Sequence, residues 1–161
     1  LRVIHTPGHC LGHCCLYVEE RGLLFSGDHI LPNIWPNPLL EEEHQGSRCR
    51  AYPAYLKSIE QISRLQVEQV FPGHGQPFSQ ISQVIQGFWA HHSKRQQRVL
   101  DCLTSKPQTP YQITSLLYPE AKELNLFLTL SKVWGHLDVL ADRKRIRECC
   151  QHPVTYYKVF A

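Results

Sequence analysis

Three short segments of the chain share one arrangement, in which an apolar run ends in a glycine-containing turn that carries histidine or aspartate. They are residues 3–9, 24–29 and 70–75, which read VIHTPGH, LFSGDH and VFPGHG. Branched and aromatic apolar residues favour strands, and glycine allows the backbone to turn with a positive φ angle. Imidazole and carboxylate groups are ligands of borderline divalent metals. We therefore predict three strands that each present a metal-binding side chain at one sheet edge.

The spacing of apolar residues and turn residues predicts the other elements. Strands are expected at 2–5, 14–18, 23–26, 67–71, 146–150 and 154–160, and helices at 56–65, from residue 81 onward, at 110–118 and at 124–141. Residues 31–51, with three prolines and the run Glu41, Glu42, Glu43, are expected to form an exposed loop. Two late helices followed by a hairpin is the order of a winged-helix module. We therefore predict two domains, 1–90 and 91–161.

Composition narrows the class of protein. The net charge is +3 over 161 residues, which is too small an excess to indicate a nucleic-acid-binding protein by itself. No apolar run is long enough to cross a membrane, so no membrane partner is expected. The seven cysteines, an odd number, favour reduced thiols in a cytoplasmic protein. The chain begins at Leu1 and contains no methionine, which we interpret as a segment of a longer polypeptide.

The turns at residues 6–9 (TPGH), 26–29 (SGDH) and 72–75 (PGHG) resemble, in order and spacing, the last three metal-site motifs of the metallo-β-lactamase superfamily. Within this superfamily, the chain most resembles glyoxalase-II-like hydrolases, in particular the lactamase-beta-2-like branch with a C-terminal winged helix. The resemblance implies an α/β (α+β) fold, namely the second half of an αββα sandwich followed by a small winged-helix domain.

The resemblance also implies roles for individual residues. His9 would bind the first of two divalent metal ions, His74 the second, and Asp28 both, which makes Asp28 the catalytic residue of the set. Zinc is the expected metal, with iron or manganese as alternatives. A hydroxide held between the ions would hydrolyse an ester, thioester, amide or phosphodiester bond of a small-molecule substrate. His91 and His92 are candidates for substrate contact, or else lie on an ordinary helix surface.

The sequence departs from the superfamily in one respect, because the His-x-His-x-Asp-His motif is absent. We therefore expect these 161 residues alone to bind metal weakly and the intact parent to be the hydrolase. A metal-dependent nuclease, a winged-helix nucleic-acid binder and an inactive fragment remain alternatives, although no nucleic-acid-binding residue is assigned. His5, His13 and His29 either orient a metal ligand or only form local hydrogen bonds. An uncovered sheet face would favour a homodimer.

Overall fold

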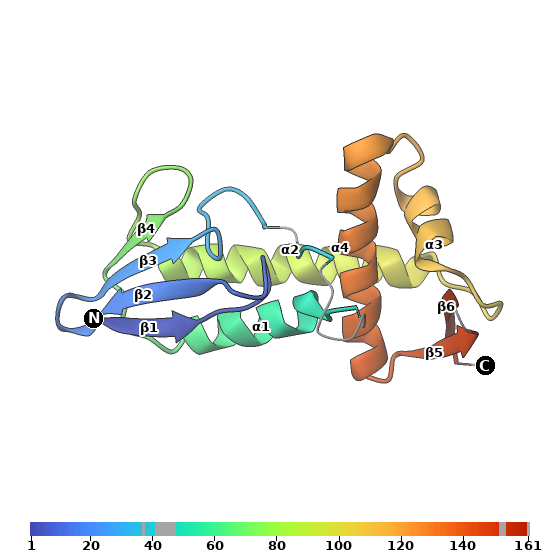
Figure 1. Cartoon of the computed structure of the whole chain (residues 1–161), viewed down its shortest axis with the longest axis horizontal. Coiled ribbons are helices and arrows are strands. Elements are labelled where there is room, and N and C mark those ends of the chain that lie inside the picture. The colour runs from blue at the N-terminus through green and yellow to red at the C-terminus, as the bar shows by residue number, and fades with distance from the viewer. Residues whose placement is uncertain (37, 41–47, 152–153, 161) are drawn as a thin grey trace. The chain divides into compact units, whose positions relative to one another are not determined.

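The computed structural model describes all residues except 37, 41–47, 152–153 and 161 (Figure 1). The run Glu41, Glu42, Glu43 therefore lies outside the described residues, as does the joint of the C-terminal hairpin at 152–153. The chain divides into two compact units, Leu1–His91 and His92–Ala161. Each unit has its own sheet and is described by itself.

The first unit is built on a four-stranded sheet in the order β1-β2-β3-β4, made of β1 (Arg2–His5), β2 (Cys14–Val18), β3 (Leu23–Gly27) and β4 (Gln69–Pro72). Strands β1, β2 and β3 pair antiparallel, whereas β3 and β4 pair parallel. The strands expected at 14–18 and 23–26 are confirmed as β2 and β3, and they form a hairpin in which Gly22 has a φ of 59°.

Helix α1 (Ala51–Ile62) connects β3 to β4 and packs on one sheet face, and helix α2 (Ile81–Asp101) follows β4 in the chain. The Tyr55 hydroxyl of α1 donates to the His29 carbonyl (2.7 Å), and the Ser58 hydroxyl donates to the Pro7 carbonyl (3.0 Å). The Tyr55 ring also meets Phe88 of α2 edge-on, with centroids 5.4 Å apart. These contacts fix both helices beneath the turns that end β1 and β3.

The ends of α1 differ from the expected 56–65. The helix begins at Ala51, the last residue of the predicted loop, and Ala51, Tyr52 and Tyr55 are buried. These three residues precede Leu56, at which the expected helix started. The helix ends before Leu65, where the Ser63 hydroxyl donates to the Glu60 carbonyl (2.8 Å). Such a local side-chain bond competes with continuation of the helix.

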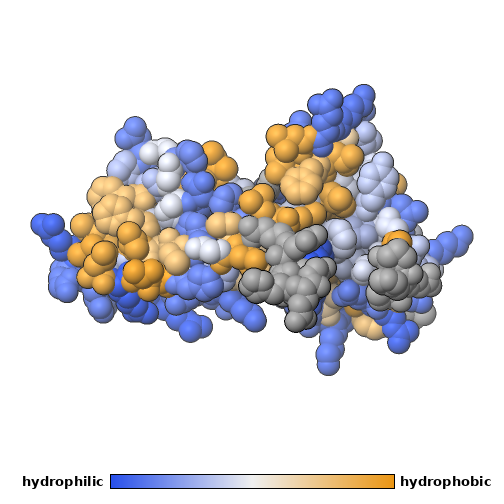
Figure 2. All heavy atoms as spheres, in the orientation of Figure 1, coloured by the Kyte–Doolittle hydropathy of each residue, from blue (hydrophilic) through white to orange (hydrophobic). Residues whose placement is uncertain are grey.

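The two faces of the first sheet have different surroundings. The buried face carries Ile4, Cys15, Tyr17, Leu24 and Val70. The opposite face exposes Val3, Leu16 and Phe25, which are direct neighbours across β1, β2 and β3. Figure 2 shows apolar residues gathered over these strands. Among the described residues, the outer face of the sheet is therefore both apolar and exposed.

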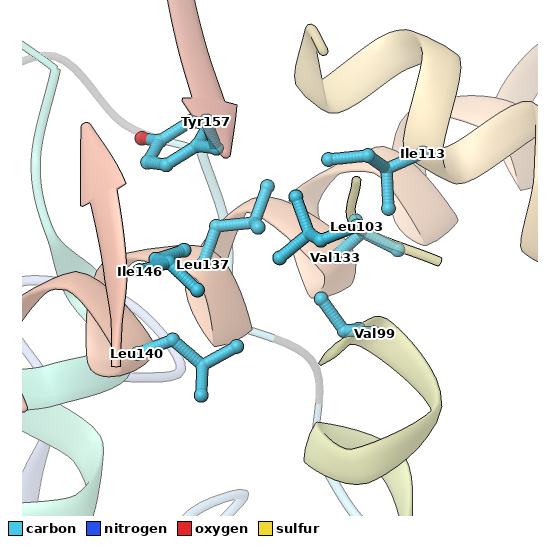
Figure 3. Packing of buried hydrophobic residues seen from close by; sticks show 8 residues of the cluster. All are labelled: Val99, Leu103, Ile113, Val133, Leu137, Leu140, Ile146 and Tyr157. Carbon is cyan, nitrogen blue, oxygen red and sulfur yellow. The ribbon is translucent and has the colours of Figure 1, made fainter. Parts of the chain in front are cut away.

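The second unit contains α3 (Pro110–Leu117), α4 (Glu123–Asp142) and the antiparallel hairpin of β5 (Ile146–Gln151) and β6 (Val154–Val159). Its core, which Figure 3 shows, consists of Val99, Leu103, Ile113, Val133, Leu137, Leu140, Ile146 and Tyr157. The expected order of two helices and a hairpin is confirmed. No helix in the described ranges is long and apolar enough to cross a membrane.

Candidate metal centre

The sheet topology brings the three predicted ligand turns to one edge. Because β1 and β3 are each antiparallel to β2, they run in the same direction, and β4 is parallel to β3. The turns after β1, β3 and β4 therefore all leave the same end of the sheet (Figure 1). At this end of the sheet, side chains that follow different strands can meet around one ligand.

The three predicted metal ligands do come together. His9 Nε2 lies 3.8 Å from Asp28 Oδ2, and His74 Nε2 lies 3.4 Å from Asp28 Oδ1. Each imidazole thus faces a different oxygen of the same carboxylate. The His9 and Asp28 side chains are about one-third exposed, at 31% and 30%, whereas His74 is 71% exposed. The arrangement is open to solvent mainly on the His74 side.

Glycines make this close approach possible. A Cβ atom at Gly73 would collide with Asp28 Oδ1 and would lie 3.0 Å from the Gly27 carbonyl carbon. The Gly73 N–H also donates to the Gly27 carbonyl (2.8 Å), so the turns after β3 and β4 are joined directly. Gly27 itself has a φ of 50°, in the region that glycine adopts without strain.

The donor set fits part of a two-metal site. A carboxylate whose two oxygens face two different imidazoles can bridge two cations, and imidazole and carboxylate suit zinc, iron and manganese. His9 Nδ1 is buried without a hydrogen-bond partner in the described structure. Across the described ranges, no group of three or more His, Cys, Asp or Glu side chains is arranged to hold one ion. The described residues therefore offer each candidate metal position two side chains, fewer than the three protein ligands usual for catalytic zinc.

Two further histidines lie behind the ligands. His29 is fully buried, and burial, followed by nearby His13 and His9, lowers its pKa to about 3. His13 stacks on His29 with ring centroids 5.5 Å apart. Burial, followed by the His9 charge, lowers the pKa of His13, while Asp28 acts in the opposite direction. The His29 ring is therefore neutral at physiological pH.

His91 and His92 occupy different environments. The His91 ring lies 5.8 Å from the Trp35 ring in the first unit. His92 is buried in the second unit, where it stacks on His136 with centroids 5.1 Å apart. Their suggested contact with substrate stays a prediction.

Residues 1–74 match the family model described as the metallo-beta-lactamase superfamily. The chain is 34% identical over 157 residues to the probable metallo-hydrolase YqjP of Bacillus subtilis, an alignment that covers 97% of this chain and 49% of that protein. It is 30% identical over 151 residues to a beta-lactamase-like protein 2 homolog of Drosophila melanogaster, covering 91% and 47%.

Two solved structures support the same fold. The metallo-beta-lactamase family protein TTHA1429 of Thermus thermophilus superposes with a TM-score of 0.79 at 27% identity, covering 99% of this chain and 49% of that one. A beta-lactamase domain protein from Burkholderia ambifaria gives 0.81 at 27% identity, covering 99% and 48%. The predicted fold class is confirmed, whereas the glyoxalase-II-like branch and the winged helix stay predictions. The chain spans about half the length of the relatives that it matches.

Proposed function

We propose that this chain forms the Asp28 side of the active site of a metal-dependent hydrolase. The observation that carries the proposal is the position of Asp28, whose two carboxylate oxygens face His9 and His74 separately. When bound, two divalent ions lower the pKa of a shared water and neutralise the oxyanion of an acyl or phosphoryl transition state. Esters and thioesters of small molecules are the substrate class that we favour.

Asp28, His9 and His74 have different roles in the proposed site. Asp28 links the two metal positions, so its loss should affect both ions. His9 and His74 each serve one position, because each faces only one carboxylate oxygen. His9 is the more buried of the two, and its turn is held by close packing of Gly8 against Tyr55. We propose zinc as the resident metal, with iron or manganese as alternatives that the same donors accept.

The test uses the intact parent protein with Asp28→Asn, which keeps the side-chain shape but removes the charge. We expect metal content, measured by elemental analysis, to fall at both positions and hydrolysis of p-nitrophenyl acetate to fall at least a hundredfold, since both functions depend on one carboxylate. Asp101→Asn is the matched control, because Asp101 is exposed and bonded only to Gln97 among the hydrogen bonds observed. Near-normal turnover of Asp28→Asn would remove the two-metal proposal.

One feature favours a nucleic-acid substrate as the second candidate. Arg147 and Lys158 are directly opposite each other on the β5–β6 hairpin, on the face opposite buried Tyr157. Like charges in cross-strand pairs are unfavourable, and a bound phosphate would relieve that repulsion. A phosphate-contacting protein loses affinity steeply with salt. Two results would support this alternative. The affinity for a single-stranded RNA should fall at least tenfold between 50 and 200 mM salt, and Lys158→Gln should bind the same RNA more weakly than the wild type.

A further inference from the structure

A chain of hydrogen bonds runs behind His13 into the core of the first unit. His13 Nδ1 lies 2.8 Å from the Thr6 hydroxyl oxygen. The Thr6 hydroxyl donates to Cys15 Sγ (3.4 Å), and the Cys15 thiol donates to the Ser26 carbonyl (3.7 Å). Thr6, Cys15 and Ser26 are all fully buried, so water does not compete for these groups.

The number of hydrogen atoms available for these three hydrogen bonds decides which nitrogen of His13 is protonated. The Ser26 carbonyl can only accept, so the single thiol hydrogen of Cys15 points toward it. Cys15 therefore accepts from Thr6, which uses the only hydrogen of the Thr6 hydroxyl. The hydrogen bond between His13 Nδ1 and the Thr6 hydroxyl oxygen therefore forms only if Nδ1 carries the hydrogen. Nε2 of the neutral ring is then left with a free lone pair.

The geometry also fixes where that lone pair lies. A Cβ atom at Gly27 would come within 2.7 Å of His13 Nε2, so the nitrogen sits directly beside the Gly27–Asp28 turn. Stacking on His29 holds the plane of the His13 ring. In the part of the chain that the structure describes, Nε2 forms no hydrogen bond. His13 is only half-buried, unlike His29, and can therefore meet a ligand.

We propose that His13 is a further functional residue of this centre, whose Nε2 accepts a hydrogen bond from the attacking water and so orients it toward the substrate. This inference rests on the proposed hydrolase function. The lone pairs of His9, Asp28 and His74 are assigned to metal, and His29 is fully buried. Among the described imidazoles near this turn, His13 thus offers a free acceptor nitrogen beside the Gly27–Asp28 turn.

The first experiment measures the protonated nitrogen directly in the intact parent protein. Nitrogen-15 NMR of labelled histidine distinguishes the two neutral ring forms, and the signal of His13 is assigned by its loss in His13→Phe. We expect the Nδ1–H form in the wild type and in Thr6→Ser, which retains the hydroxyl. Thr6→Val lacks it and should give a mixture of both forms. An Nε2–H ring in the wild type would overturn the proposal.

The second experiment separates orientation of water from packing. His13→Phe keeps the ring and its stacking on His29, whereas His13→Gln can place an oxygen near the position of Nε2. With p-nitrophenyl acetate as the probe, we expect kcat to fall tenfold or more in His13→Phe, KM to change less than twofold, and kcat to recover in part in His13→Gln. Full kcat in His13→Phe, or equal loss in both variants, would show a packing role only and would overturn the proposal.

The two proposals fail in different ways. If the wild-type protein hydrolyses none of the ester, thioester and phosphodiester probes, the hydrolase function fails, and with it the role of His13 in attack. The NMR measurement would still establish whether the Thr6–Cys15 chain sets the protonated nitrogen. If the wild type is active and His13→Phe is equally active, the hydrolase stands and only the inference about His13 fails.

Discussion

At the scale of single residues, the most unusual side chain near the candidate centre is His29. Its ring is completely buried between His13 and Tyr55, at centroid distances of 5.5 and 4.7 Å. Neither ring nitrogen has a hydrogen-bond partner in the described structure. A neutral imidazole tolerates this environment, but a charged one would be strongly destabilised because it would lose its hydration.

The burial of His29 predicts a dependence of stability on pH. Its pKa is lowered from 6.5 to about 3 in the folded chain. Between these values the unfolded chain binds the extra proton, so stability is present above pH 6.5 and is lost as pH falls toward 3, by up to about 1.4 kcal/mol per pH unit. We measure the free energy of unfolding with urea at pH 4.5 and at pH 7. The difference between the two pH values should be smaller in His29→Phe than in the wild type. Equal pH dependence in the variant and the wild type would contradict this assignment.

At the scale of elements, the position of Asp28 depends on the contact between two turns. Gly73, after β4, leaves no room for a side chain beside Asp28 and the Gly27 backbone. Gly73→Ala should displace the carboxylate and cost about 1–3 kcal/mol of stability through overpacking. We expect zinc affinity of the parent protein, measured by competition with a chelator, to fall at least tenfold. Gly12→Ala is the control, since a Cβ there meets no atom within 4 Å, and equal zinc affinity in both variants would argue against this role of the turn contact.

Much of the fold and of the site could be predicted because it depends on local sequence. Each candidate ligand follows a strand with a plain apolar pattern. Thr109 followed by Pro110 is typical of a helix start, and in the structure Thr109 forms a capping box with Gln112 at the start of α3. The start of α1 was not predicted, because Tyr55 contacts His29 and Phe88 of α2, which are both distant in the sequence. The arrangement of His13 also depends on tertiary contacts, since Thr6 reaches it only after β1 and β2 pair. Spacing along the chain does not contain that information.

At the scale of the whole molecule, the outer face of the first sheet is the feature with the broadest consequence. Val3, Leu16 and Phe25 are 64%, 38% and 42% exposed and form one row across three strands. Phe25 continues the row by stacking on Phe71 of β4, with centroids 5.0 Å apart. A row of adjacent apolar side chains in water favours association through that face, because burial of apolar surface stabilises it.

A polypeptide of these 161 residues alone should therefore self-associate. Phe25→Lys places a charge in the middle of the row and should weaken the association at least tenfold, or about 1.4 kcal/mol. Sedimentation equilibrium measures the effect. Leu116→Lys is the control, because Leu116 is also a large, exposed apolar side chain, at 61%, but lies on α3 in the other unit. If the wild-type polypeptide is monomeric at 100 μM, or if Leu116→Lys disrupts association as strongly as Phe25→Lys, the sheet face is not the surface through which copies associate.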